Sequence, residues 1–174
     1  MAVVRQPVEV FRLEPSEWDR FKEPILRFER RDFPAGLQED ASDLRRLVES
    51  PTSIVIGIRT DDNALAGYIA ADELENFGDV PGAREDPHWQ HRDTYYIATV
   101  VVAPEMRLHG CATLLTRRCV EVVARNGRAR VTAHMAAGAA AKIDPRIRIC
   151  GSYPDWYGTG RTFEYIEIPL VVAE

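Results

Sequence analysis

A strand-like segment followed by a short loop and a helix constrains this chain more than any other feature. Residues Thr94–Ala103 read TYYIATVVVA, and this run of β-branched, aromatic and small side chains predicts a strand. Pro104 ends the strand, and Thr113–Asn126 has the apolar period of a helix. The first N–H groups of a helix have no internal partners, and the helix dipole adds positive potential there. With Gly110 and the cation of Arg107 in the loop, the segment predicts a phosphate-binding site.

A short motif indicates which phosphate this loop would bind. The run Val102-x-Pro104-x-x-Arg107-x-x-Gly110-x-Ala112-x-x-Leu115 resembles the coenzyme A signature of the GNAT acetyltransferase superfamily. In that family Arg/Gln-x-x-Gly-x-Gly/Ala follows a strand, and the loop wraps the pyrophosphate of acetyl-CoA. The glycine spacing of a dinucleotide-binding fold and the Gly-Lys-Ser/Thr of a P-loop are both absent from the sequence. The alternative for this loop is an ordinary strand-to-helix turn with an exposed arginine.

The resemblance implies which residues hold the coenzyme. Backbone N–H groups of the loop and first helical turn would bind the pyrophosphate, with Arg107 adding charge. A backbone N–H of the preceding strand would stabilise the oxyanion that develops on the acetyl group. The expected coenzyme-binding residues are Val100, Val101, Val102, Arg107, Leu108, His109, Gly110, Cys111, Ala112 and Thr113.

The order of the expected elements also fits the GNAT fold. The resemblance implies an α/β (α+β) architecture with a central mixed, mostly antiparallel sheet, splayed between its fourth and fifth strands and flanked by helices. We expect one domain over residues 1–174, which is long enough to bury a sizeable core. The expected strands are Pro7–Leu13, Thr52–Arg59, Leu65–Ala71, Thr94–Ala103, Arg128–Met135 and Thr162–Val172.

The expected helices follow Ser16, begin near Ala41, cover Thr113–Asn126 and occupy part of Ala136–Lys142. Pro24 should split or kink the first of them, because proline has no N–H to donate.

The C-terminal part both resembles the family and departs from it. Tyr157-Gly158-Thr159-Gly160 before the last strand is similar to the end of GNAT proteins. Family members often carry an asparagine after the fifth strand and a tyrosine on the next helix. Neither residue type occurs between Met135 and Gly151, so that catalytic tyrosine is not carried over.

Acetyl transfer to an amine needs a neutral amine, a donor for the oxyanion and a proton for the leaving thiolate. Acidic residues after the third strand are the natural place for a base. Glu73 is our first choice, with Asp72 and Glu75 as substrate-binding groups that would attract a cationic amine. His134 is a second catalytic candidate, because an unperturbed imidazole titrates near neutrality. The alternatives are solvated loop carboxylates and a histidine satisfied within the core.

An aromatic loop near the C-terminus supplies the remaining candidates. We expect Tyr153 to act as general acid and Trp156 and Tyr157 to contact substrate, the alternative being aromatic packing at a rim. His88 and His91 are close together, but we found no further ligand near them in the sequence, so we expect no metal.

Composition excludes several classes of protein. A net charge of −5 argues against a nucleic-acid partner, and no run approaches the ~20 apolar residues of a membrane span. Early charged residues argue against a signal peptide. Three cysteines without Cys-x-x-Cys spacing indicate neither disulfides nor zinc, so we expect a reducing cytoplasm. Apolar residues on both sides of the last strand predict a homodimer.

Together these features predict an acetyl-CoA-dependent N-acetyltransferase that modifies a primary amine by direct transfer in a ternary complex. The acceptor would be a small-molecule or peptide amine, and the acidic segment after Ala71 favours a cationic small molecule. The alternative is a non-catalytic GNAT-like module that binds acyl-CoA or a protein partner as a sensor. A regulatory domain that binds a partner without coenzyme A is a third interpretation.

Overall fold

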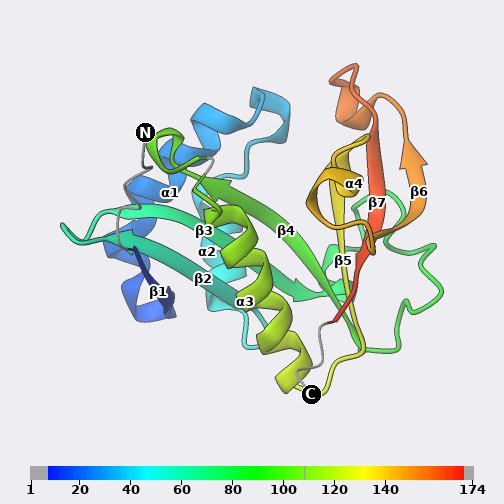
Figure 1. Ribbon diagram of the computed structural model, residues 1–174, viewed down its shortest axis with the longest axis horizontal. Coiled ribbons are helices and arrows are strands. Elements are labelled where there is room, and N and C mark those ends of the chain that lie inside the picture. Colours follow the sequence, from blue (N-terminus) through cyan, green and yellow to red (C-terminus); the bar gives the residue numbers. More distant parts are fainter. Residues whose placement is uncertain (1–7, 108, 171–174) are drawn as a thin grey trace. The chain divides into compact units, whose positions relative to one another are not determined.

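The computed structural model describes residues 8–107 and 109–170 and contains both strands and helices (Figure 1). The strands are β1 (Val8–Arg12), β2 (Ile54–Thr60), β3 (Leu65–Glu73), β4 (Thr94–Val102), β5 (Arg130–Ala136), β6 (Arg148–Tyr153) and β7 (Phe163–Ile168). The α-helices are α1 (Trp18–Asp32), α2 (Ala41–Glu49), α3 (Cys111–Arg125) and α4 (Ala140–Ile143). Among the residues described, no helix has both the length and the hydropathy of a membrane span.

The strands form one mixed sheet, as expected. Their order is β1-β2-β3-β4-β5-β7-β6. The β1–β2, β5–β7 and β6–β7 ladders are antiparallel, whereas β4 and β5 run parallel. The β4–β5 register covers only Thr94–Ile97 of β4, and the strand continues to Val102 beyond the last of these pairs. This short ladder agrees with the expected separation of the fourth and fifth strands.

The chain divides into two compact units. Unit 1 comprises the residues up to Ala70 together with Thr99–Cys119, and unit 2 comprises Ala71–Ala98 and the residues from Val120 onward. The chain passes between the units inside β3, β4 and α3, so neither unit is a continuous stretch of sequence.

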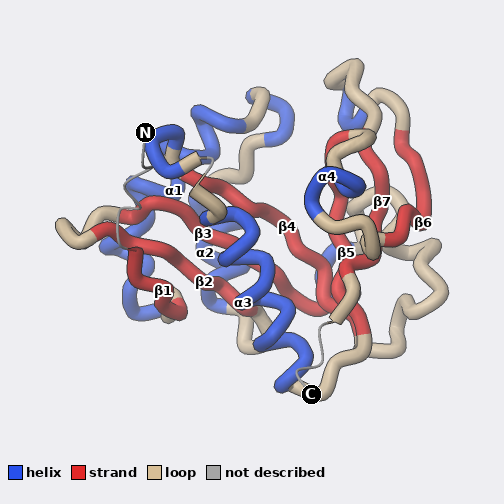
Figure 2. The backbone as a smooth tube through the Cα atoms, viewed as in Figure 1, coloured by secondary structure: helices blue, strands red, loops and turns tan. Residues whose placement is uncertain are grey.

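In unit 1, α1 and α2 lie on one face of β2 and β3, and α3 begins on the other (Figure 2). The apolar stripe of α1 is buried as its helical spacing predicts. Phe21 packs on Phe11 of β1 with ring centroids 5.3 Å apart, and Phe28 lies 6.3 Å from the ring of Tyr68 on β3. Aromatic contacts therefore attach the helix to the sheet.

The expected split of the first helix at Pro24 does not occur, and the alternative, a kink, stays a prediction. The helix α1 continues through Pro24 for 15 residues. The lost backbone hydrogen bond is the one to the carbonyl of Arg20, a residue at the exposed surface where water can replace it. Burial of the apolar stripe offsets the remaining cost.

A buried carboxyl group lies within the unit 1 core. Glu29 of α1 is only 2% exposed, and the Tyr68 hydroxyl donates to its Oε1 at 2.8 Å. The Glu39 N–H donates to Oε2 at 3.3 Å. Burial raises the pKa of Glu29, and these two hydrogen bonds only partly oppose that rise.

In unit 2, the long segment between β3 and β4 folds onto the sheet through a buried ion-pair network. Asp86 from this segment accepts hydrogen bonds from Arg130 Nη1 at 2.7 Å and from the Tyr165 hydroxyl at 2.8 Å. The same guanidinium contacts Glu167 at 2.8 Å. Burial alone would raise the pKa of Asp86, but the hydrogen bonds from Arg130, from the His88 N–H and from Tyr165 bring it below its usual value.

Two expectations about the C-terminal part were wrong. Strand β6 was not expected, because Gly151 interrupts its alternation and most of its side chains are exposed, so no apolar period marks it. The last strand ends at Ile168 rather than at Val172, since Pro169 cannot donate to a ladder. Residue Val172 lies outside the described residues.

The apolar residues of β7 are used inside unit 2. Phe163 stacks on Trp156 with centroids 5.4 Å apart, and the ring of Tyr165 lies 4.9 Å from that of His134. These contacts account for part of the pattern that suggested a subunit contact, and the homodimer stays a prediction.

Candidate functional site

The loop expected to bind pyrophosphate lies in unit 1, directly after β4. A 3₁₀ turn at Pro104–Met106 leads to Gly110, whose φ of +79° is a left-handed conformation that favours glycine. A Cβ added at Gly110 would meet nothing within 4 Å, so the loop is open at this point. The first helical hydrogen bond runs from the Leu114 N–H to the Gly110 carbonyl at 2.9 Å. The N–H groups before Leu114 therefore have no intrahelical acceptor, which is the arrangement that binds anions.

The second half of β4 is the expected site of the oxyanion donor. Val101 and Val102 are buried, while Val100 is 36% exposed. Gly67 of β3 allows close approach on this side, because a Cβ there would lie 2.6 Å from the Val101 carbonyl oxygen. The Ala103 N–H donates to the Ala66 carbonyl at 2.8 Å and continues the contact past the end of the strand.

Arg107 has a partner that the sequence did not reveal. Its Nη2 donates to Asp32 Oδ1 at 2.7 Å, and its Nε donates to the Val102 carbonyl at 3.3 Å. Arg31 donates to both carboxylate oxygens of Asp32 and also to the Val102 carbonyl. The hydrogen bond from Arg31, followed by that from Arg107, outweighs burial and lowers the pKa of Asp32. One carboxylate thus partly neutralises two guanidinium groups beside the loop.

The other expected coenzyme residues differ in exposure. His109, Ala112 and Thr113 are exposed, whereas Cys111 is buried. Burial raises the pKa of the Cys111 thiol, which disfavours a reactive thiolate. Leu108 lies outside the described residues.

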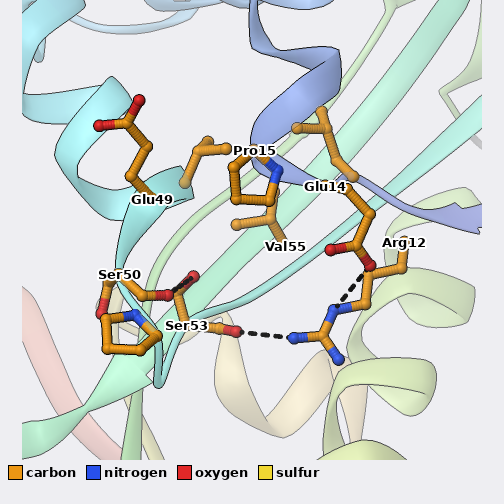
Figure 3. Close-up of a pocket in the computed structure, with 10 residues that line it drawn as sticks. Arg12, Glu14, Pro15, Glu49, Ser50, Ser53 and Val55 are labelled. Carbon is orange, nitrogen blue, oxygen red and sulfur yellow. Dashed lines mark hydrogen bonds and ion pairs between the residues drawn. The ribbon is translucent and has the colours of Figure 1, made fainter.

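A separate pocket of about 160 Å³ in unit 1 contains none of the expected site residues (Figure 3). It lies where the chain leaves β1, α2 ends and β2 begins. Arg12 crosses it and donates to the Ser53 carbonyl at 3.3 Å, while its Nε lies 3.4 Å from Glu14 Oε1. Arg12 therefore already has a carbonyl and a carboxylate as partners in this pocket.

The expected third strand, Leu65–Ala71, extends in β3 to Glu73, so Asp72 and Glu73 end the strand and Glu75 follows it; these acidic residues lie in unit 2 and have distinct partners. Glu73 Oε1 accepts from Arg128 at 2.5 Å, and Asp72 is buried and accepts from the Glu73 N–H at 2.8 Å. Glu75 Oε1 accepts from the Arg92 N–H at 2.8 Å. Glu75 Oε2 is buried, and no described residue offers it a hydrogen bond. The first-choice base is therefore neutralised by an arginine, and Glu75 keeps a free acceptor atom.

His134 of β5 lies among aromatic rings. Its Nδ1 is 3.0 Å from the Tyr96 hydroxyl, and its ring centroid lies 4.2 Å from that of Trp156 and 5.2 Å from that of Tyr153. Burial lowers the pKa of His134 to about 4, and an interaction with the backbone of Pro81 opposes only part of that shift. The imidazole is thus neutral near pH 7, and its position fits the core histidine that we kept as the alternative.

Tyr153, at the end of β6, is not in the loop where the sequence placed it. A Cβ added at Gly82 would lie 2.6 Å from its Cζ, so the ring rests against the Gly82 backbone. Burial, and then the charges of Glu85 and Asp86, raise the pKa of Tyr153 and keep it protonated. Its hydroxyl has no hydrogen-bond partner among residues 8–107 and 109–170.

The structure brings several candidates together in one aromatic cluster, consisting of His134, Tyr153, Trp156 and Tyr157. Trp156 is buried at its centre, and Tyr157 is half exposed with a left-handed φ of 46°. Glu73 and Glu75 make their side-chain hydrogen bonds outside this cluster, with the Arg128 side chain and the Arg92 N–H respectively.

Comparison with known families decides the relationship that the loop suggested. A model of the Acetyltransferase (GNAT) family matches residues 16–142, which include β4, the loop and α3. The chain belongs to the GNAT acetyltransferase family. A search of curated protein sequences gives no significant match.

Solved structures of GNAT proteins share the fold at low sequence identity. The ribosomal-protein-S18-alanine N-acetyltransferase from Escherichia coli aligns with a TM-score of 0.68 at 12% identity, over 97% of each chain. NAA60 from Arabidopsis thaliana in complex with acetyl-CoA gives a TM-score of 0.67 at 15% identity, over 93% of this chain and 98% of that one. An aminoglycoside acetyltransferase, HMB0005, from an uncultured soil metagenomic sample gives 0.55 at 26% identity, over 76% and 81%.

Sequence reasoning missed the partners of two expected site residues of this GNAT chain. The pairs Arg107–Asp32 and Arg128–Glu73 join positions 75 and 55 residues apart, and no local signal links them. The carboxylate of Asp93, by contrast, lies two residues after His91 and was visible in the sequence.

Proposed function

We propose that this GNAT protein transfers the acetyl group of acetyl-CoA to a primary amine by direct transfer in a ternary complex, with the whole chain acting as one acyltransferase domain. The observation that carries this proposal is the open loop at Gly110 between β4 and the N-terminus of α3. The family match supports it, because the matched residues include this loop.

Backbone groups would do most of the work of holding the coenzyme. The N–H groups of Cys111, Ala112 and Thr113 point out of the first turn of α3 and would bind the pyrophosphate. Arg107 would contribute charge only after exchanging Asp32 for a phosphate oxygen. Its side chain is 51% exposed, so such an exchange requires only a side-chain rotation.

For the acid–base chemistry we assign the proton donor to Tyr153 and the base to Glu75. The amine nitrogen attacks the thioester carbonyl carbon, the C–S bond breaks, and the thiolate takes a proton. Tyr153 is protonated and has an unoccupied hydroxyl, which suits the donor. Glu75 has a buried free oxygen that can receive a proton from the ammonium, whereas Glu73 is held by Arg128.

We propose a cationic small-molecule amine as the acceptor. The end of β3 and the segment after it carry a negative charge, which attracts ammonium groups; the acidic residues are Asp72, Glu73, Glu75 and Asp79. The aminoglycoside acetyltransferase, which is similar at 26% identity, supports an acceptor of this kind. A peptide amine is the alternative acceptor.

The proposal is tested by calorimetric titration of the protein with acetyl-CoA and with pantetheine, which lacks the pyrophosphate. Ala112→Glu places a carboxylate in the exposed first turn of α3, and Ala41→Glu makes the same change in the first turn of α2. We expect acetyl-CoA affinity to fall at least tenfold in Ala112→Glu and to stay unchanged in Ala41→Glu, because only the first change opposes the pyrophosphate. Equal affinities in both variants, or none in the wild type, would refute the loop as the coenzyme site.

Turnover is then measured as thiol release with polyamines, aminoglycosides and peptides as acceptors. Release with cationic small molecules supports the proposed acceptor class. Coenzyme binding without turnover on any amine would favour the non-catalytic sensor, for which the Glu73–Arg128 ion pair is the supporting observation.

A further inference from the structure

Two histidines and an aspartate converge in unit 2 at the end of the segment that precedes β4. The ligand atoms of His88, His91 and Asp93 all lie within 4.8 Å of one another. His88 Nδ1 donates to Asp93 Oδ2 at 2.9 Å, and the two imidazole rings are 5.3 Å apart at their centroids. None of these three side chains has a role in the acetyl transfer proposed above.

Neighbouring groups hold two of these residues in place. The His88 N–H donates to Asp86 Oδ1 at 2.8 Å, which connects it to the buried ion-pair network. The buried Thr94 hydroxyl donates to Asp93 Oδ1 at 2.8 Å, so Oδ2 is the oxygen that remains for a ligand or for His88. Hydrogen bonds that orient metal-binding side chains in this way strengthen metal sites.

The backbone around His91 adopts an unusual conformation. Gln90 and Arg92 have φ values of 71° and 54°, which are left-handed and cost non-glycine residues about 1–3 kcal/mol each. The His91 N–H donates to the His88 carbonyl at 3.0 Å, which closes the turn and returns His91 towards His88. The Arg92 N–H donates to Glu75 and fixes the far side of the turn. These hydrogen bonds hold the left-handed backbone of Gln90 and Arg92 in place beside the three potential ligands.

We propose that His88, His91 and Asp93 bind one divalent transition-metal ion, Zn²⁺ being the favoured occupant, with water completing its coordination. Two imidazole nitrogens and one carboxylate oxygen form a donor set that Zn²⁺ accepts, at about 2.0–2.2 Å. In a tetrahedral site with these bond lengths the ligand atoms lie about 3.4 Å apart, so the 2.9 Å contact between His88 and Asp93 has to widen slightly and any longer separation within the cluster has to close. His91 is exposed and free to rotate, and the ion replaces the proton between His88 and Asp93.

The charge near the site allows a cation. The Asp93 carboxylate accepts hydrogen bonds from the His88 ring and from the Thr94 hydroxyl, and its negative charge attracts a cation. Arg128 contacts the Arg92 carbonyl, but its charge is balanced by Glu73. A bound ion would connect His88 and His91 to Asp93, the residue directly before β4.

The test uses the full chain, with any polyhistidine tag removed and metal stripped by a chelator. Calorimetric titration with Zn²⁺ should give one ion per chain. Zn²⁺ affinity should fall at least tenfold in His91→Gln and about a hundredfold or more in the double variant His88→Gln/His91→Gln, because each change removes a ligand. His109→Gln is the matched control, since His109 is exposed and lies outside the cluster.

Thermal unfolding provides a second measurement that does not depend on acetyl transfer. A ligand that binds only the folded state raises the melting temperature. Zn²⁺ should therefore raise it in the wild type and His109→Gln and not in His91→Gln. Co²⁺ absorption in the visible range should appear with the same variant dependence. No saturable Zn²⁺ binding by the wild type, or an affinity that the double variant leaves unchanged, would overturn the proposal.

Discussion

The substitution Asp86→Ala tests whether the buried ion-pair network fixes the segment before β4 in unit 2. The Asp86 side chain is 1% exposed, and that of Arg130 is 9% exposed. Alanine removes the acceptor for Arg130, for the Tyr165 hydroxyl and for the His88 N–H in one step. The change therefore leaves a buried guanidinium and two other donors without this partner.

The expected loss of stability depends on the partners that Arg130 keeps in the variant. Removing one partner of a buried ion pair costs about 3–5 kcal/mol, because the other charge stays buried. Here Glu167 still accepts from Arg130 at 2.8 and 2.9 Å, so the loss should lie at the lower end. We expect the free energy of unfolding to fall by about 3 kcal/mol, which for a chain of this length is a drop of about 6–12 °C in melting temperature.

Urea unfolding, followed by circular dichroism, measures this difference. Asp79→Ala is the matched control, since the Asp79 side chain is exposed and lies 3.7 Å from Arg84, so its loss should leave the midpoint unchanged. A loss below about 1 kcal/mol for Asp86→Ala would refute the reasoning, because it would mean that the buried arginine needs no second carboxylate.

The contribution of Asp86 to the free energy of unfolding should depend on pH. The pKa of Asp86 is lower in the folded protein than in the unfolded chain. Its contribution is therefore fully present above the unfolded value of about 3.9 and is lost as the pH falls through the folded pKa. The stability gap between wild type and Asp86→Ala should narrow on acidification below about pH 4, and a constant gap would contradict this assignment.

Three further predictions concern single sites. Gly67→Ala should destabilise the protein by about 1–3 kcal/mol and weaken acetyl-CoA binding, because its Cβ would press on the Val101 carbonyl, whereas Gly36→Ala has open space and should be neutral. Glu29→Gln should be more stabilising, relative to the wild type, at pH 7 than at pH 4. Because burial raises the pKa of Glu29 in the folded state, the wild type loses stability as the pH rises from the unfolded pKa towards the folded one, and glutamine does not ionise. Cys150 should react first with a thiol reagent, because the other two cysteines are buried.

Each of these has a clear contrary result. Equal urea midpoints for the two glycine variants would mean that β3 and β4 are not closely packed at that point. A wild-type protein whose stability, measured against Glu29→Gln, does not decline between pH 4 and pH 7 would remove the buried carboxyl effect. Equal labelling rates for all three cysteines, followed by mass spectrometry, would contradict the burial of two of them.

The fold was predictable where local patterns are strong. The strand β4 and the helix α3 were expected within two residues of their observed bounds, because apolar period and Pro104 act on neighbouring residues. The edge strand β6 was not, since an exposed strand has no need of an apolar face. Its existence depends on pairing with β7, which is a contact between separate parts of the chain.

The candidate site shows the same division. The position of the Gly110 loop between β4 and α3 could be predicted, because its motif is continuous and depends on one helix N-terminus. The sequence could not predict which charged side chains are free to bind a ligand and which are already paired. Asp32 holds Arg107 and Arg128 holds Glu73 because the fold brings distant positions together, and a single sequence gives no sign of either pair.

Because the chain crosses between the two units three times, neither unit can complete its fold early in translation. Unit 1 includes Thr99–Cys119, and unit 2 needs β5, β6 and β7. During translation the first seventy residues emerge without the strand and helix that complete their core, and no unit is finished when the ribosome reaches Ala98. Neither unit can be expressed alone as one continuous fragment, so truncated products should be substrates for chaperones and proteases rather than half-active proteins.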